Sequence, residues 1–397
     1  MNVDDTLKHD LVSTFTLSFK DQQKLKIDMK NILKTIVLSI AILIYVSPLS
    51  QACTGIKLKA EDGSYVYGRT LEWGAFDLNS KMVVVPQGHQ FKGLTPEGRN
   101  GKDYQSKYGF IAVTAFGDDV LADGMNEAGL AGGGFYHPGY ANYPAYDKKK
   151  ADNTISAQDI LTYMLGNFKD VAEVKKGLLE VNVTGVILES VGLELPGHWM
   201  MSDATGATVV IEFTNGELKM YDSNVGVITN APNYDWHLTN LSNYLNLTPH
   251  PQNPVEINDI AIKPLGAGSG FLGLPGDNTP VSRFVRATAY AHTSRKTTDA
   301  KEAVYELFRI LDNFNLPLGP DGGEGANADH FDNSLRSTTL WTSAANINDL
   351  QYSYHTQHNR RVRMIDLKEI DFSNIGEEII YLELDEKKEQ DIEKIKL

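Results

Sequence analysis

The chain has 397 residues, 42% of them hydrophobic and 22% charged, which is the balance of an ordinary globular protein. A net charge of −14 repels phosphate backbones, and no Lys/Arg-rich stripe with interleaved aromatic residues opposes it, which argues against nucleic acid as a partner. A single cysteine excludes an internal disulfide and a cysteine-based zinc site.

The first 52 residues are typical of a targeting segment. Residues 36–46 form one apolar run behind Lys30 and Lys34, and this run is shorter than the roughly 20 residues that a membrane-spanning helix needs. A basic flank followed by a short apolar run favours a secretory signal over an uncleaved membrane anchor. We therefore expect an exported bacterial protein, periplasmic or secreted, with no stable insertion in the membrane.

The end of this segment fits a cleavage site. Ser50 and Ala52 are small residues at the −3 and −1 positions, so cleavage would make Cys53 the first residue of the mature chain. Met29 would begin a signal of conventional length, which makes residues 1–28 an overlong start. A different class of protein, a lipoprotein anchored through Cys53, would need Leu at −3, where this chain has Ser50.

From Cys53 onward the sequence predicts blocks of strands and helices in one uninterrupted unit. Strands are expected at 55–60, 64–69, 81–85, 110–116, 207–213, 218–222, 338–346, 350–356 and 360–367, with hairpin turns at 61–64 and 215–216. Helices are expected at 157–165 and 171–181, capped by Ser156 and Asp170, and at 282–292 and 300–314. No repeat or linker divides the chain, so residues 53–397 are predicted to form one domain of stacked sheets covered by helices, with a charged tail from residue 385.

A mature N-terminal cysteine would bring a nucleophile and a base in one residue. The thiol has a reference pKa of about 8.5 and the α-amine one of about 7.7–8.0, so the amine can take the thiol proton directly or through one water. Such a site needs no histidine, and none of the ten histidines falls in a recognisable triad or metal-binding spacing.

Four ordered segments resemble the choloylglycine hydrolase family, which holds bile salt hydrolases and penicillin V acylases. They are CTGIKLKAEDGSYVYGRTLEW (53–73), DGMNEAGLAGGGFYHPGY (123–140), ITNAPNYDWHLTNLSNY (228–244) and GAGSGFLGLPGDNTPVSRFVRAT (266–288). The resemblance implies the α+β fold of N-terminal nucleophile hydrolases, a four-layer αββα sandwich. It also implies hydrolysis of a carbon–nitrogen bond in a linear amide.

The resemblance assigns catalytic roles residue by residue. Cys53 is the nucleophile, and Arg69 would lie beside it and favour the thiolate. Glu72 would orient the α-ammonium, although the family usually has Asp in this R-x-x-D-W segment. Asn230 would donate to the oxyanion, and Arg283 would supply a further charge, with Arg286 one turn later as the alternative.

The resemblance places the substrate near Trp73, Tyr136 and Leu272. Bile salt hydrolases usually carry Asn at the position of Tyr136, and penicillin V acylases usually carry Tyr. The expected substrate is a small amide with a bulky apolar acyl group, with glycine- or taurine-conjugated bile salts first, penicillin V second and N-acyl homoserine lactones third.

Other motifs predict no cofactor and no metal. Residues 266–273 superficially resemble a dinucleotide-binding loop but lack the preceding strand and the following helix. His355 and His358 have no carboxylate partner on a helix, so they do not indicate a metal site. The family tends toward tetramers, so the resemblance also implies a homo-oligomer.

Overall fold

Antiparallel pairing builds two large sheets in the computed structural model, which describes residues 53–74, 77–117, 120–189, 192–317 and 337–396. The first sheet has the strand order β16-β1-β2-β19-β20-β21 and the second the order β15-β14-β13-β8-β7-β6-β3-β22. The signal segment and the cleavage site predicted within residues 1–52 lie outside the described residues and stay predictions.

The strands of the first sheet are β1 (Cys53–Lys59), β2 (Tyr65–Trp73), β16 (Val227–Ile228), β19 (Thr338–Asn346), β20 (Gln351–Thr356) and β21 (Arg363–Asp366). Those of the second are β3 (Lys81–Val85), β6 (Phe110–Ala115), β7 (Val120–Asn126), β8 (Leu130–Tyr136), β13 (Gly197–Asp203), β14 (Thr208–Thr214), β15 (Glu217–Asp222) and β22 (Ile380–Glu383). Short pairs are β4 (Gln90–Lys92) with β5 (Asp103–Gln105), β9 (Thr154–Ser156) with β10 (Asn182–Thr184), β11 (Ile187–Leu188) with β12 (Leu193–Glu194), and β17 (Val255–Ile257) with β18 (Ile260–Ile262).

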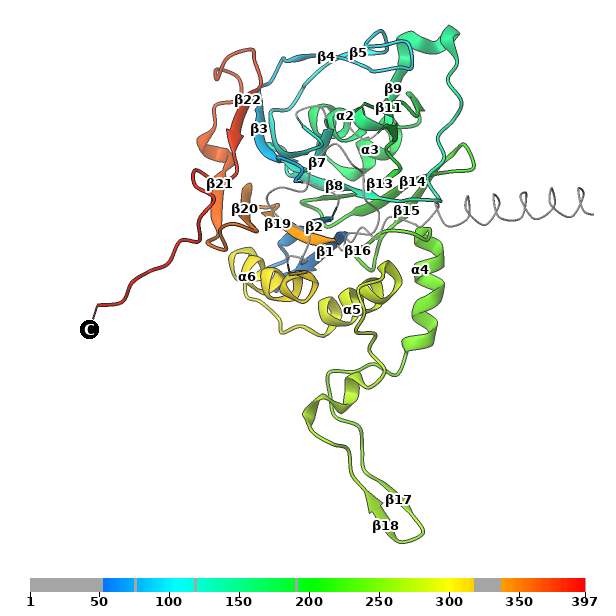
Figure 1. Ribbon diagram of the computed structural model, residues 1–397, viewed down its shortest axis with the longest axis vertical. Coiled ribbons are helices and arrows are strands. Elements are labelled where there is room, and N and C mark those ends of the chain that lie inside the picture. The colour runs from blue at the N-terminus through cyan, green and yellow to red at the C-terminus, as the bar shows by residue number, and fades with distance from the viewer. Residues whose placement is uncertain (1–52, 75–76, 118–119, 190–191, 318–336, 397) are drawn as a thin grey trace, which may run out of the picture. The chain divides into compact units, whose positions relative to one another are not determined.

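Helices cover the outer face of each sheet (Figure 1). The α-helices are α2 (Ile160–Asn167), α3 (Val171–Gly177), α4 (Tyr234–Asn240), α5 (Pro280–Thr293) and α6 (Ala300–Leu311). Helix α5 packs on β1 and α6 on β2 and β19, whereas α2 packs on β7 and β8 and α3 on β13 and β14. The result is the four-layer αββα sandwich of an α+β protein, as the family resemblance implied.

The alternation along β13 shows how the layers share the core. Met200 packs into the cluster between the two sheets, whereas its neighbours Trp199 and Met201 pack into the cluster under α2 and α3. Because successive side chains of a strand point to opposite faces, His198 lies on the same side as Met200, between the sheets. Polar residues on this inner face are therefore buried.

The predicted elements are found with small shifts at their ends. Asp170 caps α3 by accepting from the Glu173 backbone N–H at 2.8 Å. Ser156 caps a 3₁₀ turn (Ala157–Asp159) that leads into α2, so the first turn is tighter than predicted. The helix predicted for 171–181 ends at Gly177, because the chain turns there to pair β10 with β9.

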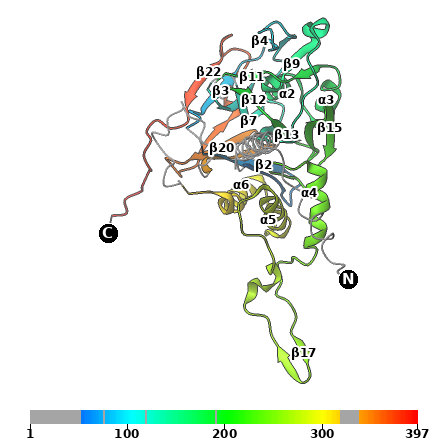
Figure 2. The ribbon, with the colours of Figure 1, turned by 45° about the vertical axis from the view of Figure 1, so that its right-hand side comes forward.

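One hairpin lies apart from the layers. Strands β17 and β18 extend away from both sheets in the two views, and all six of their residues are exposed (Figures 1 and 2). Among the helices of the described ranges, none combines the length and apolarity needed to cross a membrane. The predicted charged tail forms neither helix nor strand over residues 386–396.

Candidate active site

Cys53 is the first residue of β1, and its side chain is 5% exposed at the wall of a pocket. The antiparallel register sets Cys53 opposite Leu71 and Gly55 opposite Arg69 on β2. The hairpin that the sequence predicted therefore carries the cysteine, the arginine and, three residues later, Glu72 into one pocket.

The rest of the pocket is mainly apolar and aromatic. Its wall includes Leu71, Trp73, Phe116, Tyr136, Leu195 and Trp199. Trp73 stands edge-on to Phe116, with ring centroids 4.6 Å apart, and to Tyr136, with centroids 5.9 Å apart. An apolar lining with a few polar groups at one wall suits a hydrophobic acyl group.

Arg69 brings a buried positive charge to this wall. Its Nη1 donates to the carbonyl oxygens of Ala122 at 2.8 Å and Gly134 at 2.5 Å, and its guanidinium lies 4.2 Å from the centroid of the Phe135 ring. Its Nη2 has no hydrogen-bond partner although the side chain is fully buried. The backbone carbonyls fix the guanidinium while leaving part of its donor capacity unused.

Burial and charge act on the thiol in opposite directions. Burial raises the pKa of Cys53, Arg69 lowers it, Glu72 raises it and Arg283 lowers it, and the net pKa is above the ordinary value. The thiol is therefore protonated at neutral pH and needs a base to become a nucleophile.

Glu72 is itself poised between its two protonation states. Burial raises its pKa to about 7, against the opposing effects of Arg283, Thr70 and Arg69. Its Oε1 accepts from Thr339 Oγ1 at 3.2 Å, whereas its Oε2 is buried without a hydrogen-bond partner. A carboxyl group with one open oxygen can take a further donor, such as an ammonium group.

Asn230 and Arg283 hold the backbone of Cys53. Asn230 Oδ1 accepts from the Cys53 backbone nitrogen at 3.0 Å and from Arg283 Nη2 at 2.5 Å, and Asn230 Nδ2 donates to the Tyr136 carbonyl at 2.7 Å. Arg283 Nη1 donates to the Cys53 carbonyl and to Thr54 Oγ1. The nucleophile is thus fixed by side chains far away in sequence.

The matches to known proteins agree with this arrangement. The linear amide C–N hydrolases of the choloylglycine hydrolase family match residues 53–381. The chain belongs to this family. Its members hydrolyse carbon–nitrogen bonds in linear amides, so the chain is a hydrolase of that class, as the sequence predicted.

Individual relatives cover most of the chain. It is 32% identical to a bile salt hydrolase/transferase of Clostridium perfringens, over 79% of this chain and 92% of the relative. It is 26% identical to a penicillin V acylase of Pectobacterium atrosepticum, over 87% and 89%. A solved conjugated bile acid hydrolase mutant from Clostridium perfringens superposes with a TM-score of 0.73 at 29% identity, covering 87% of this chain and all of that one.

The structure brings together most of the residues that the family resemblance named. Cys53, Arg69, Glu72, Trp73 and Tyr136 line one pocket. Asn230 and Arg283 contact the Cys53 backbone from outside the set of pocket-lining residues.

Two other residues that the resemblance named lie away from this group. Arg286 points elsewhere, donating to the carbonyls of Pro275 and Asp277, so Arg283 is the arginine beside Cys53. Leu272 is 76% exposed and does not line the pocket.

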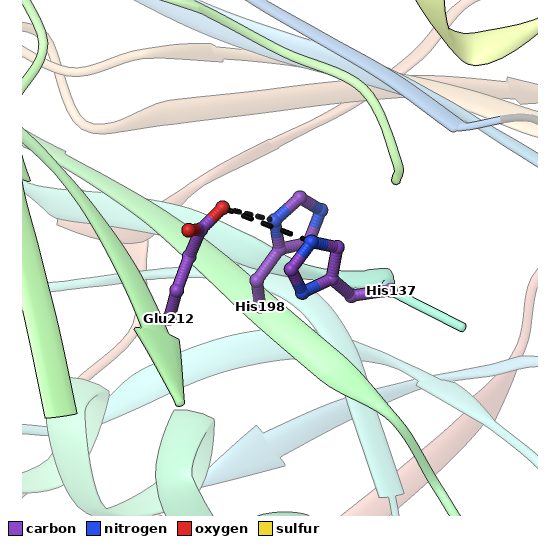
Figure 3. A group of neighbouring side chains, drawn as sticks. All are labelled: His137, His198 and Glu212. Atoms are coloured by element: carbon purple, nitrogen blue, oxygen red, sulfur yellow. Dashed lines mark hydrogen bonds and ion pairs between the residues drawn. The ribbon is translucent and has the colours of Figure 1, made fainter. Parts of the chain in front are cut away.

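A second polar group, which the sequence analysis missed, lies between the sheets near Asn230. His137, His198 and Glu212 are buried side by side (Figure 3). They are too far apart in sequence to form a recognisable motif. The one available signal was His198 and Glu212 at matching positions of neighbouring strands, since β13 and β14 pair them directly.

The ring geometry of this group is not that of a metal site. The rings of His137 and His198 are stacked, with an interplanar angle of 1° and centroids 4.2 Å apart. A histidine nitrogen binds a metal through a lone pair that lies in the ring plane. One ion cannot lie near the planes of two stacked parallel rings, so this arrangement does not fit a metal centre, and only His198 and Glu212 of the group are hydrogen-bonded to each other.

Proposed function

We propose that the chain, cut before Cys53, hydrolyses bile salts conjugated to glycine or taurine. Relatives from Clostridium perfringens and Lactobacillus acidophilus, both 32% identical, are named for hydrolysis of bile salts or conjugated bile acids. The observation that carries the proposal is the position of the Cys53 thiol at the wall of a mainly apolar and aromatic pocket. Pockets that bind small apolar molecules are typically lined in this way, with a few polar groups that orient the ligand.

In the first half of the reaction, the free α-amine of Cys53 takes the thiol proton and the sulfur attacks the acyl carbonyl. The carbonyl oxygen becomes an oxyanion. Asn230 Nδ2 has two hydrogens and uses one on the Tyr136 carbonyl, so the other can stabilise the oxyanion together with a backbone N–H. When the carbon–nitrogen bond breaks, the α-ammonium returns the proton to the leaving amine.

In the second half, water hydrolyses the thioester. The α-amine takes a proton from this water as it attacks, and the acid and the free thiol are released. The charges of Glu72 and Arg69 act in both halves of the reaction. When ionised, Glu72 attracts the α-ammonium and has one oxygen free to accept from a donor, and Arg69 stabilises the thiolate.

This mechanism requires a free amine at Cys53, which links it to export. A signal peptide ending at Ala52 would release that amine during secretion, to the periplasm or the medium. The family match begins at residue 53, which is consistent with a mature chain that starts there. Mass spectrometry of the exported protein tests this point: a diacylglyceryl group on Cys53 would remove the base and overturn the mechanism.

Penicillin V is the second candidate substrate. The aromatic wall of Trp73, Phe116 and Tyr136 favours it, because edge-to-face contacts stabilise an aryl group such as phenoxyacetyl. The 26% identical relative from Pectobacterium atrosepticum is a penicillin V acylase. An N-acyl homoserine lactone is the third candidate.

Amine release from glycocholate, taurocholate, penicillin V and an N-acyl homoserine lactone decides among these substrates, with the chain beginning at Cys53. Faster release of glycine or taurine supports the proposal. Preference for penicillin V or the lactone transfers it to that substrate. The absence of release from all four, with the α-amine shown to be free, would refute every acyl group named here.

A further inference from the structure

Two buried histidines donate to the main chain on either side of Asn230. His198 Nε2 lies 3.1 Å from the Thr229 carbonyl oxygen, and His237 Nε2 lies 3.0 Å from the carbonyl oxygen of Asn230 itself. Both side chains are almost fully buried. A carbonyl oxygen only accepts, so each Nε2 must carry the hydrogen.

The other side of the His198 ring determines where a further proton lies. His198 Nδ1 is 3.2 Å from Glu212 Oε1, and Tyr234 donates its backbone N–H to the same oxygen at 2.9 Å. With the Nε2 hydrogen committed to Thr229, a neutral ring offers only a lone pair at Nδ1. A lone pair and an ionised carboxylate would repel each other, so the Glu212–His198 pair must hold one additional proton between them.

That proton belongs on the carboxyl group. Burial raises the pKa of Glu212 and lowers the pKa of His198 to about 3. Arg69 also lowers the pKa of His198, and Arg283 is among the groups that lower that of His237. A neutral network avoids repulsion with the two arginines that the reaction uses.

These contacts fix the backbone from which the Asn230 side chain extends. The Thr229 and Asn230 carbonyls belong to the two peptide groups that flank the Asn230 Cα, so holding both oxygens restricts both backbone dihedrals. Arg283 and the Cys53 nitrogen then fix the side-chain oxygen. The direction of the remaining Nδ2 hydrogen follows from these restraints.

We propose that the Glu212–His198 pair and His237 are positioning residues that hold Asn230 in place as the oxyanion donor, with Glu212 acting as a neutral acid. This inference rests on the proposed function of Asn230. It adds a relay, meaning a chain of hydrogen bonds, from Glu212 on β14 through His198 on β13 to the Thr229 carbonyl. Glu212 and His198 belong to the second sheet, and Thr229 follows the end of β16 in the first. Sequence spacing does not reveal this relay, because its parts meet only when the two sheets stack.

Two pairs of variants test the relay in the chain beginning at Cys53. His198→Phe removes the donor to Thr229, whereas His198→Gln can replace it with an amide N–H. Glu212→Leu removes the contacts with both His198 and Tyr234. Glu212→Gln can place an amide N–H at Nδ1 but then leaves the Tyr234 N–H without its acceptor, because both contacts use Oε1. His355→Phe is the matched control, because His355 is also buried but packs against Phe308 away from Asn230.

Two reactions of the same thiol separate positioning from general damage. Acylation by p-nitrophenyl phenoxyacetate forms an oxyanion, whereas alkylation by iodoacetamide does not. We expect His198→Phe and Glu212→Leu to slow acylation about 10- to 100-fold with KM and the alkylation rate within about twofold. His198→Gln and the control should stay within about threefold of the parent chain, whereas Glu212→Gln should acylate faster than Glu212→Leu but more slowly than the parent.

The outcomes that would overturn the inference are distinct. Equal acylation rates in His198→Phe and the parent would show that Asn230 needs no support. Equal losses of acylation and alkylation would show a structural role only, and the two glutamine variants cover the case in which His198→Phe does not fold. An acylation rate of Glu212→Gln as low as that of Glu212→Leu would refute the proposal that Glu212 acts as a neutral acid.

A failure of the proposed function would be detected by a different measurement. It would appear in the parent chain, as an absence of amine release from the amide substrates. Because the ester probe reports acylation of Cys53 regardless of amide specificity, the relay can still be tested in that case.

Discussion

Two fully buried carboxyl groups are bonded in opposite ways. Asp123, on β7, accepts from three hydroxyl groups: Tyr67 at 2.9 Å, Ser343 at 2.6 Å and Tyr352 at 2.5 Å. These donors come from β2, β19 and β20 of the facing sheet, so Asp123 ties the two sheets together.

Glu72 has one hydroxyl donor and one buried oxygen without a partner. A buried polar atom that lacks a hydrogen bond costs about 1–3 kcal/mol of stability. The comparison teaches that burial alone does not make a carboxyl group reactive. Asp123 has its bonding capacity filled by groups of the facing sheet, whereas Glu72 keeps one oxygen open, as the role proposed for it in the reaction requires.

The largest effect should come from replacing the thiol of Cys53, the residue whose α-amine Glu72 is proposed to orient. Cys53→Ser should lower kcat/KM for amide hydrolysis about 1000-fold or more, because the hydroxyl is a far weaker nucleophile than the thiol under the same amine base. The exchange of one atom in a preformed site should leave stability nearly unchanged. Steady-state kinetics together with thermal unfolding check this, and a Cys53→Ser chain with full activity would contradict the thiol mechanism.

The next largest effect tests Asp123 as a structural group. Asp123→Ala leaves three buried hydroxyls without their acceptor, and we expect a loss of about 3–5 kcal/mol in the free energy of unfolding. Asp123→Asn keeps one acceptor oxygen and should cost less than half as much. Urea unfolding measures both, with Asp103→Ala as a control, because Asp103 forms an exposed ion pair with Lys92. Equal small losses in all three would remove the contrast with Glu72.

The contrast also shows what the sequence could and could not reveal. The hairpin around residues 61–64 and the helical periodicity of 300–314 are local patterns, and the structure contains both elements. Strand β8 was not predicted, because its run Gly132–Gly134 has low strand propensity. The reason for glycine is tertiary: a Cβ at Gly132 would lie 2.1 Å from the Met200 carbonyl oxygen on the neighbouring strand.

The residues of the site divide in the same way, into those that a local sequence pattern indicates and those that only tertiary contacts bring together. Arg69 and Glu72 follow Cys53 on one hairpin, so a motif of 21 residues could point to them together. The contacts of Asn230 with Cys53 and Arg283 span 177 and 53 residues, and only the family resemblance suggested them. Asp123 carried no signal, because its partners come from the opposite sheet, and the one signal for His198 was Glu212 at the matching position of the neighbouring strand.

A smaller effect concerns the cost of keeping Glu72 buried. Its pKa is about 7 in the folded chain and 4.5 in its ordinary state, so between these values the folded state binds more protons than the unfolded state. Stability contributed by Glu72 is therefore present below pH 4.5 and is lost as the pH rises to 7. Glu72→Gln should remove this loss and stabilise the chain at pH 8 by on the order of 2–3 kcal/mol, while reducing activity.

Urea unfolding of Glu72→Gln and the parent chain at pH 4, 6 and 8 checks the sign. The difference between the two chains isolates Glu72 from the buried histidines, whose lowered pKa values act in the opposite direction. Glu217→Gln is the matched control on an exposed position of β15 and should show no pH-dependent difference. A Glu72→Gln chain less stable than its parent at pH 8 would show that the ionised carboxylate is well paired.

The smallest effect concerns substrate choice at the pocket wall. Tyr136→Asn removes a ring that stands edge-on to Trp73, which opens the apolar pocket and takes away an aromatic contact for an aryl group. We expect the ratio of kcat/KM for glycocholate to that for penicillin V to rise about tenfold, equivalent to about 1.4 kcal/mol. Leu272→Ala is the control: Leu272 is exposed and outside the pocket, so the ratio should stay within about twofold. A shift caused by Leu272→Ala alone would mean that its loop closes over the bound substrate, and the pocket wall near Cys53 would then not be what selects the acyl group.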